Sequence, residues 1–307
     1  MLTNFFGKSK PINFIIVSIY IIIGCFLCSI NALGDPQEFP FFQKQTLLLL
    51  VCIFSIFLLN FIVIKNNLTE NNTYSIFFFA CFMLMIPLFF NNTDILVSNI
   101  FLLLAFRRIL SFSSKKNMEK KILDASIWIT LASLFYFWSI LFFTVLFIAV
   151  IQQQSKNYKL ILIPFVGFLS IMVLTTSYNL IQGNSLLWFS NIDRSISIDF
   201  QTYDKISLII PISILAILLV LTLFKKLINF SENRLNEKSK STILILILFT
   251  SLVSILLFPI KTGGEFLYIM APLAIFTANF IEKLQTFWIK ELILWLTLIV
   301  PIIIAVL

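Results

Sequence analysis

The stretch that decides the fold is FRRILSFSSKKNMEKK, residues 106 to 121, which lies between two long apolar segments. It holds six basic residues and a single acid, Glu119. Each Arg or Lys at the centre of a membrane helix costs roughly 2.5 to 3.5 kcal/mol on insertion scales, so such a block does not cross a bilayer. We therefore predict that it stays on the cytoplasmic side, and that this placement orients every other apolar segment.

The composition predicts an all-α, polytopic transmembrane helical bundle that forms a single integral membrane domain over residues 1–307. Hydrophobic residues make up 60% of the chain and charged residues only 12%, whereas soluble domains carry about 25% charged residues. The net charge of +8 does not indicate nucleic acid, because the basic residues lie in short turns between apolar runs, where membrane orientation explains them.

The chain has no histidine, which excludes Ser-His-Asp and Cys-His catalysis, histidine-bound haem or iron, and most zinc enzymes. The four cysteines lie inside apolar segments, where they are expected to act as small apolar residues: Cys25, Cys28, Cys52 and Cys81. The sequence predicts no metal site and no cofactor.

The first apolar run, residues 12 to 33, follows Lys8 and Lys10. It is longer than the core of a signal peptide and lacks a clean A-x-A site, which favours an uncleaved membrane helix. Further runs of roughly 17 to 25 residues are each long enough to span a bilayer. They begin near Thr46, Ser75, Ile95, Tyr158, Lys205, Thr242, Glu265 and Thr286.

Residues 122 to 152 are long for one membrane helix and short for two. A hairpin turning near residues 135 to 138 gives eleven crossings with the N-terminus cytoplasmic and the C-terminus outside. It leaves four of the 22 basic residues outside, namely Lys44, Arg194, Lys205 and Lys261. A single helix would move every later loop to the opposite side of the membrane and leave ten of the 22 basic residues outside. The positive-inside rule therefore favours the hairpin.

The outward loops predicted by this topology carry more acids than bases, so we expect function there. In the first loop, GDPQEFPFFQK, Asp35 and Glu38 lie between Gly34, Pro36 and Pro40, which disfavour a helix. Either acid could serve as a general base toward a lipid-linked substrate. The alternative is a solvated turn whose acids have no catalytic role and lie outside only because acids are tolerated on that side of the membrane.

Two later outward segments supply candidate substrate-binding residues. Arg194, beside Asp193, could grip a phosphate through two hydrogen bonds or pair with a neighbouring acid. In FPIKTGGEF, Lys261 precedes a Gly-Gly turn and Glu265 opens the next helix, where exposed amides could receive an anion. Ordinary capping of that helix is the alternative.

Ionisable residues are scarce inside the apolar runs. We expect Asp124, just after the basic block, to pair with Lys120 or Lys121. No acid or base lies at the centre of a run, which disfavours a proton-coupled transporter, because pumps usually place ionisable relays there.

Several segments resemble an uncharacterised family of polytopic inner-membrane proteins from Bacteroidetes, chiefly flavobacteria: KSKPINF, NNTDILVSNIFLLLAFRRILSF, ILDASIWITLASLFYFW and FPIKTGGEFLYIMAPLAIFTANFIE. This resemblance implies a multi-pass location in the bacterial inner membrane and no assigned function. A looser similarity is to membrane glycosyltransferases that use polyprenyl-phosphate sugars. It implies that Asp35 or Glu38 is the base and that Arg194 and Lys261 hold the phosphate, although the first loop is much shorter than in those enzymes.

The leading functional hypothesis is accordingly a glycosyltransferase-like protein that handles a lipid-linked sugar on the outer side. Its expected partners are membrane lipids, including polyprenyl phosphate. The alternative is a non-catalytic membrane subunit or scaffold of a cell-envelope machine, with membrane-protein partners. A transporter is the third hypothesis.

Overall fold

The computed structural model describes residues 1–32, 39–86, 92–114, 116–153, 158–183, 196, 199–228, 235–258 and 261–306. Within these ranges all regular structure is helical and there is no strand, so the predicted all-α class is confirmed. The α-helices are α1 (Leu2–Phe6), α2 (Pro11–Ala32), α3 (Phe39–Asn66), α4 (Tyr74–Met85), α5 (Thr93–Leu110), α6 (Met118–Phe135), α7 (Phe142–Gln152), α8 (Lys159–Ile181), α9 (Ile206–Ile228), α10 (Leu235–Leu257), α11 (Leu267–Lys283) and α12 (Phe287–Val306). Short 3-10 helices are η2 (Ser111–Ser114), η3 (Phe137–Leu141), η5 (Gln201–Asp204) and η7 (Gly264–Phe266).

The chain divides into two compact units, each assembled from segments that are distant in the sequence. Unit 1 comprises Met1–Leu96, Phe200–Asn233 and Thr262–Leu307, and unit 2 comprises Val97–Asp199 and Arg234–Lys261. Unit 1 therefore contains α1 to α4, α9, α11 and α12, and unit 2 contains most of α5 together with α6, α7, α8 and α10.

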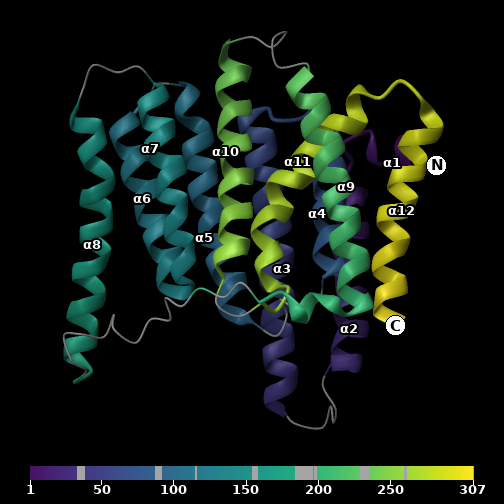
Figure 1. The fold of residues 1–307 in the computed structure, drawn as a ribbon, viewed down its shortest axis with the longest axis horizontal. Coiled ribbons are helices and arrows are strands. Elements are labelled where there is room, and N and C mark those ends of the chain that lie inside the picture. The colour runs from purple at the N-terminus through teal and green to yellow at the C-terminus, as the bar shows by residue number, and fades with distance from the viewer. Residues whose placement is uncertain are drawn as a thin grey trace. The chain divides into compact units, whose positions relative to one another are not determined.

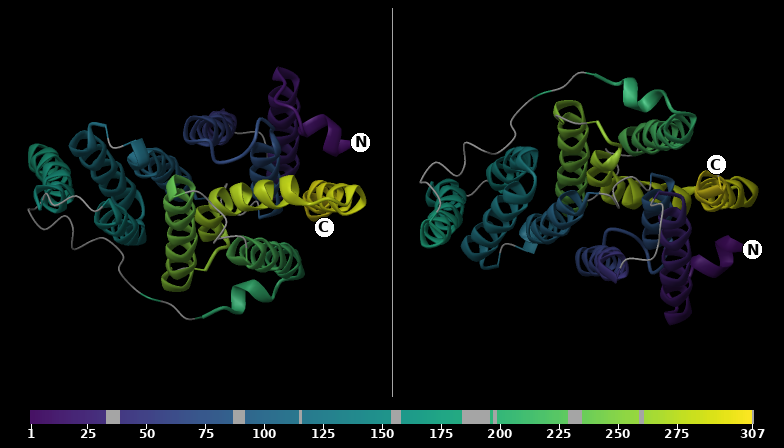
Figure 2. Two further views of the ribbon diagram at one scale, coloured as in Figure 1. Left: turned by 90° about the horizontal axis from the view of Figure 1, so that it is seen from above. Right: turned by 90° about the horizontal axis from the view of Figure 1, so that it is seen from below.

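Helices α4 and α11 form the core of unit 1, where α11 packs against both α4 and α9 (Figures 1 and 2). Every residue of α4, YSIFFFACFMLM, is buried. A helix that is apolar on all sides has no face to turn to water, so it is surrounded by other helices. Its 12 residues are fewer than the 17 to 25 expected for the run that begins near Ser75.

Helices α9 and α11 run in the same direction and are inclined to each other (Figure 1). At their starts, Tyr203 bonds to Glu265, and at their ends Lys225 and Lys283 line one pocket. Helices of 23 and 17 residues are about 35 and 25 Å long at 1.5 Å per residue. The two ends of this pair, here named the Glu265 end and the lysine end of unit 1, are therefore separated by about the thickness of a bilayer core.

Residues 118 to 152 form a hairpin in unit 2. Helix α6 stops at Phe135, Tyr136 has extended backbone with φ −143° and ψ 108°, and α7 packs back against α6. The Ser139 hydroxyl at the turn lies 2.7 Å from that of Ser98 on α5. The break falls inside the turn predicted from charge. Helix α8 then packs beside α6 and α7 (Figures 1 and 2).

Seven helices in the described ranges are long and apolar enough to cross a membrane. They are the segments Thr46–Asn66, Thr93–Ser114, Lys159–Ile181, Ile206–Lys226, Lys238–Leu257, Gly264–Lys283 and Phe287–Ile304. Three further apolar helices are shorter: Pro11–Leu27, Tyr74–Met85 and Phe137–Gln152. These lengths and compositions indicate a membrane protein, whereas the eleven crossings and the single membrane domain stay predictions.

Candidate functional site

The candidate site is built on the turn that precedes α11. Gly263 has φ 87° and ψ −16°, a left-handed conformation that glycine adopts without the penalty of a Cβ atom. The Gly264 amide donates to the Thr262 hydroxyl at 3.3 Å, and η7 then leads into α11. The Thr-Gly-Gly sequence therefore turns the chain sharply and places Glu265 inside the unit.

Glu265 is completely buried, with 0% of its surface exposed. The Tyr203 hydroxyl donates to Oε1, and the Thr262 hydroxyl donates to Oε2 at 3.4 Å. Backbone amides of the turn, from Thr262, Gly263 and Glu265 itself, also face the carboxylate. Among the described residues no basic side chain forms an ion pair with Glu265. The carboxylate of Glu265 is therefore buried among neutral hydrogen-bond donors. It takes up the turn amides that were expected to bind the anion of a substrate.

Tyr203 connects this turn to the segment before α9. It belongs to η5, and its ring meets that of Phe266 edge to face, with the centroids 5.7 Å apart. Lys205 follows in extended backbone, and its carbonyl accepts from the amide of Leu208 at 2.9 Å as α9 begins. One tyrosine therefore ties the starts of α9 and α11 together. Tyr203 was not singled out from the sequence. Its only distinguishing feature there is that it is a tyrosine just before a predicted helix start.

Lys261 lies in unit 2 and is 4% exposed. Its ammonium donates to the carbonyls of Ile255 and Leu256 at 2.6 and 2.8 Å. These carbonyls belong to the last turn of α10, where a cation complements the helix dipole. Burial lowers the pKa of Lys261 from its ordinary 10.5. Its described hydrogen bonds thus go to the end of α10.

Three of the five residues singled out from the sequence, Asp35, Glu38 and Arg194, lie outside the described residues. Their roles as base and phosphate ligand stay predictions. Of the other two, Glu265 lies with Tyr203 in unit 1, and Lys261 caps α10 in unit 2. Within the described ranges, no group of three Cys, Asp or Glu side chains is placed to hold a metal ion.

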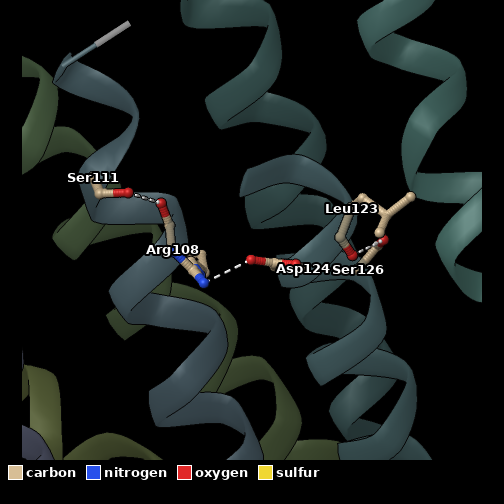
Figure 3. Close-up of polar contacts among 5 residues, drawn as sticks. All are labelled: Arg108, Ser111, Leu123, Asp124 and Ser126. Carbon is tan, nitrogen blue, oxygen red and sulfur yellow. Dashed lines mark hydrogen bonds and ion pairs between the residues drawn. The ribbon is translucent and has the colours of Figure 1, made fainter. Parts of the chain in front are cut away.

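Asp124 has a different partner from the one predicted. It pairs with Arg108 at 2.7 Å (Figure 3), while Lys121 donates to the Ser111 carbonyl at 2.7 Å and to the Ser114 hydroxyl at 2.5 Å. The expected pairing of Asp124 with Lys120 or Lys121 is therefore wrong. Lys121 donates to a carbonyl and a hydroxyl of η2, and Asp124 pairs with Arg108 on α5 instead.

Comparisons with known proteins give one match. The model of a family described as "Family of unknown function (DUF6427)" matches residues 7–306. No curated protein and no solved structure matches the chain. The resemblance to an uncharacterised family is confirmed, and none of these comparisons names a glycosyltransferase.

Proposed function

The chain belongs to the family of unknown function DUF6427, and we propose that it is a multi-pass protein of the bacterial inner membrane that transfers a sugar from a polyprenyl phosphate on the outer side. The helical architecture supports the membrane placement, because seven described helices have the length and composition of spans. The proposal assigns the reaction to the face that carries the Glu265 end of unit 1.

Charge supports that orientation. Lys225, Lys226 and Lys283 gather at one end of the α9 and α11 pair, and Glu265 lies at the other. Cytoplasmic loops carry the excess of Lys and Arg in membrane proteins. The lysine end is therefore assigned to the cytoplasm and the Glu265 end to the outside, in keeping with eleven crossings, a cytoplasmic N-terminus and an external C-terminus.

The burial of Glu265 is the observation that carries the proposal. Removing a carboxylate from water costs several kcal/mol unless hydrogen bonds and charges compensate it. Glu265 has only neutral donors among the described residues, so no described charge compensates its burial. An ionisable group retained at the edge of a membrane span points by default to a functional site.

The proposed reaction rests on the roles predicted from the sequence for Asp35, Glu38 and Arg194. Asp35 or Glu38 takes the proton of an acceptor hydroxyl, whose oxygen then bonds to the anomeric carbon of the sugar. The bond between that carbon and the phosphate oxygen breaks, and polyprenyl phosphate leaves with the electron pair. Arg194 would pair with the phosphate. Glu265, which is buried, accepts the hydrogen bond from Tyr203, and this pair holds the starts of α9 and α11 in place.

The test uses purified protein in lipid nanodiscs with an isotope-labelled polyprenyl-phosphate hexose. Release of polyprenyl phosphate is measured by mass spectrometry for the wild type and for Asp35→Ala, Glu38→Ala and Glu265→Gln. Loss of at least tenfold for Glu265→Gln and for one loop variant is the expected result. Asp94→Ala, which removes an exposed acid at the start of α5, is the control and retains activity. Activity unchanged in all three test variants overturns the proposal.

A non-catalytic membrane subunit is the competing function, in which the buried Glu265 and Tyr203 only hold the starts of α9 and α11 together. Mass spectrometry of the protein purified in mild detergent separates the two. Stoichiometric polyprenyl phosphate supports the transferase. A defined protein partner accompanied only by bulk phospholipid supports the subunit.

A further inference from the structure

A pocket at the lysine end of unit 1 has no role in the proposed transferase. It is a small hollow, open to the surface, with a cavity volume of about 20 Å³, and it lies between the last turns of α9 and α11. Its lining combines three lysines, two neutral polar residues and two aromatic rings: Lys225, Lys226, Lys283, Thr222, Asn279, Phe276 and Phe280. The shared direction of α9 and α11 brings together lysines that are almost sixty positions apart in the sequence.

The positive charge of this pocket is concentrated. The Lys225 ammonium lies 4.8 Å from the centroid of the Phe280 ring, and Lys283 and Lys290 are both close enough to repel it electrostatically. Lys225 and Lys283 form no ion pair with any carboxylate of the described residues. Lysine ammonium groups held this close repel one another, and a bound anion would offset that repulsion.

Two acids of α11 and α12 that the structure describes at this end of unit 1 are engaged elsewhere. Glu282 accepts from the Asn72 side chain at 2.5 Å and from the Glu70 amide at 3.2 Å. Glu291 accepts from the Leu2 amide at 2.7 Å and from Thr3. These bonds tie the α3–α4 connection and the N-terminal segment to α11 and α12. The carboxylates therefore serve the packing of this end, and the lysines keep an excess of positive charge.

We propose that this pocket binds the phosphate of an anionic phospholipid headgroup in the cytoplasmic leaflet. Lysines at a helix C-terminus also complement the helix dipole, but that role requires neither a pocket nor the convergence of two helices. Basic pockets between membrane helices on the cytoplasmic side are typical sites for anionic headgroups. The proposal requires the membrane placement and orientation given above and is independent of sugar transfer.

The surroundings of the pocket favour a lipid over free phosphate. On the same stretch of α9, Leu221, Phe224 and Ile228 are 46%, 67% and 62% exposed. Such side chains suit contact with acyl chains. Asn279 and Thr222 add an amide and a hydroxyl that can bond to headgroup oxygens. A diacyl phospholipid can thus place its phosphate among the lysines and its tails along the apolar surface of α9.

Native mass spectrometry of the delipidated full-length protein tests this proposal. The protein is titrated separately with phosphatidylglycerol, phosphatidylcholine and inorganic phosphate. The double variant Lys225→Gln/Lys283→Gln is compared with Lys116→Gln/Lys120→Gln, which removes the same charge from exposed positions on the same predicted membrane face. Each lysine near an anionic lipid contributes about 1 kcal/mol. The pocket variant should therefore bind phosphatidylglycerol at least tenfold more weakly, and the control should bind it like the wild type.

Three results would overturn the proposal: equal affinity of the wild type for the two lipids, an equal loss in the control variant, or displacement of the lipid by inorganic phosphate at lipid-equivalent concentration. The variant Asn279→Asp covers the case in which the double variant does not fold. It places a carboxylate among the lysines, so it should keep the fold and lose the preference for phosphatidylglycerol by a similar factor. If Asn279→Asp keeps that preference, the lysines do not form the site.

Discussion

Substitution of Gly167 tests the packing of α6 against α8, on which the hairpin and thus the topology depend. A Cβ atom at Gly167 would lie 1.8 Å from the Ser126 hydroxyl oxygen, 2.9 Å from the Ser126 Cβ and 3.3 Å from the Leu123 carbonyl oxygen. Carbon atoms pack best about 3.5 to 4.0 Å apart. Both the Ser126 side chain and the helix must therefore move when an alanine replaces Gly167.

The magnitude follows from three contributions. Rotation of Ser126 breaks its 2.7 Å hydrogen bond to the Leu123 carbonyl, which is worth about 1 kcal/mol. Separation of the helices adds an overpacking cost of about 1 to 3 kcal/mol. Ala in place of Gly inside a helix returns about 1 kcal/mol. The packing cost is larger, so Gly167→Ala should lower the free energy of unfolding by about 1 to 3 kcal/mol.

Unfolding in mixed detergent micelles, followed by tryptophan fluorescence, measures this change, and Ser126→Gly supplies the second arm of a double-mutant cycle. The double variant should recover most of the loss, because position 126 then has no side chain to collide with the added methyl group. Gly183→Ala is the control, since Gly183 has φ 77° and open space around it. The loss of stability caused by Gly183→Ala should be additive with the effect of Ser126→Gly. A Gly167→Ala protein as stable as the wild type, or a loss that Ser126→Gly does not rescue, would refute the α6–α8 contact.

Three further predictions concern charge and topology. Breaking the Arg108–Asp124 pair with Asp124→Asn should change the free energy of unfolding by less than about 1 kcal/mol, because the two side chains are 36% and 33% exposed; a loss of several kcal/mol would contradict this. Since burial lowers the pKa of Lys261, the unfolded chain binds that proton more tightly, so stability should rise with pH between the folded pKa and 10.5. Lys261→Met should remove that rise, and an unchanged slope in pH-dependent unfolding would exclude it. In intact cells a membrane-impermeant maleimide should label Thr202→Cys and not Ser114→Cys, both at exposed positions, whereas the reverse pattern would invert the topology.

The local features of the fold were predictable where a short stretch of chain decides them. The apolar run expected near Lys205 is α9, which begins at Ile206, and the break expected near residues 135 to 138 falls at Tyr136. Three of the basic residues predicted to share one face, Lys225, Lys226 and Lys283, lie together at the lysine end of unit 1. Apolar runs and breaks of this kind depend on local composition, because a long apolar segment must pair its own backbone groups as a helix.

The pairing of distant side chains was not predictable in the same way. Tyr203 and Glu265 are 62 positions apart, and Asp124 lies nearer in the sequence to Lys121 than to its observed partner Arg108. From the sequence, Lys225 and Lys283 indicated only which side of the membrane their loops face. Their convergence into one pocket depends on α9 and α11 running in the same direction.

The sequence by itself determined the helical class, the membrane composition and the segregation of charge, because each follows from hydropathy and charge summed along the chain. The tertiary structure alone decided that Glu265 is a buried acid bonded to Tyr203 and that three lysines line one pocket. Which faces of apolar helices meet depends on side-chain packing between segments far apart in the chain, and near-uniform apolar sequences such as that of α4 leave many pairings equally compatible with hydropathy.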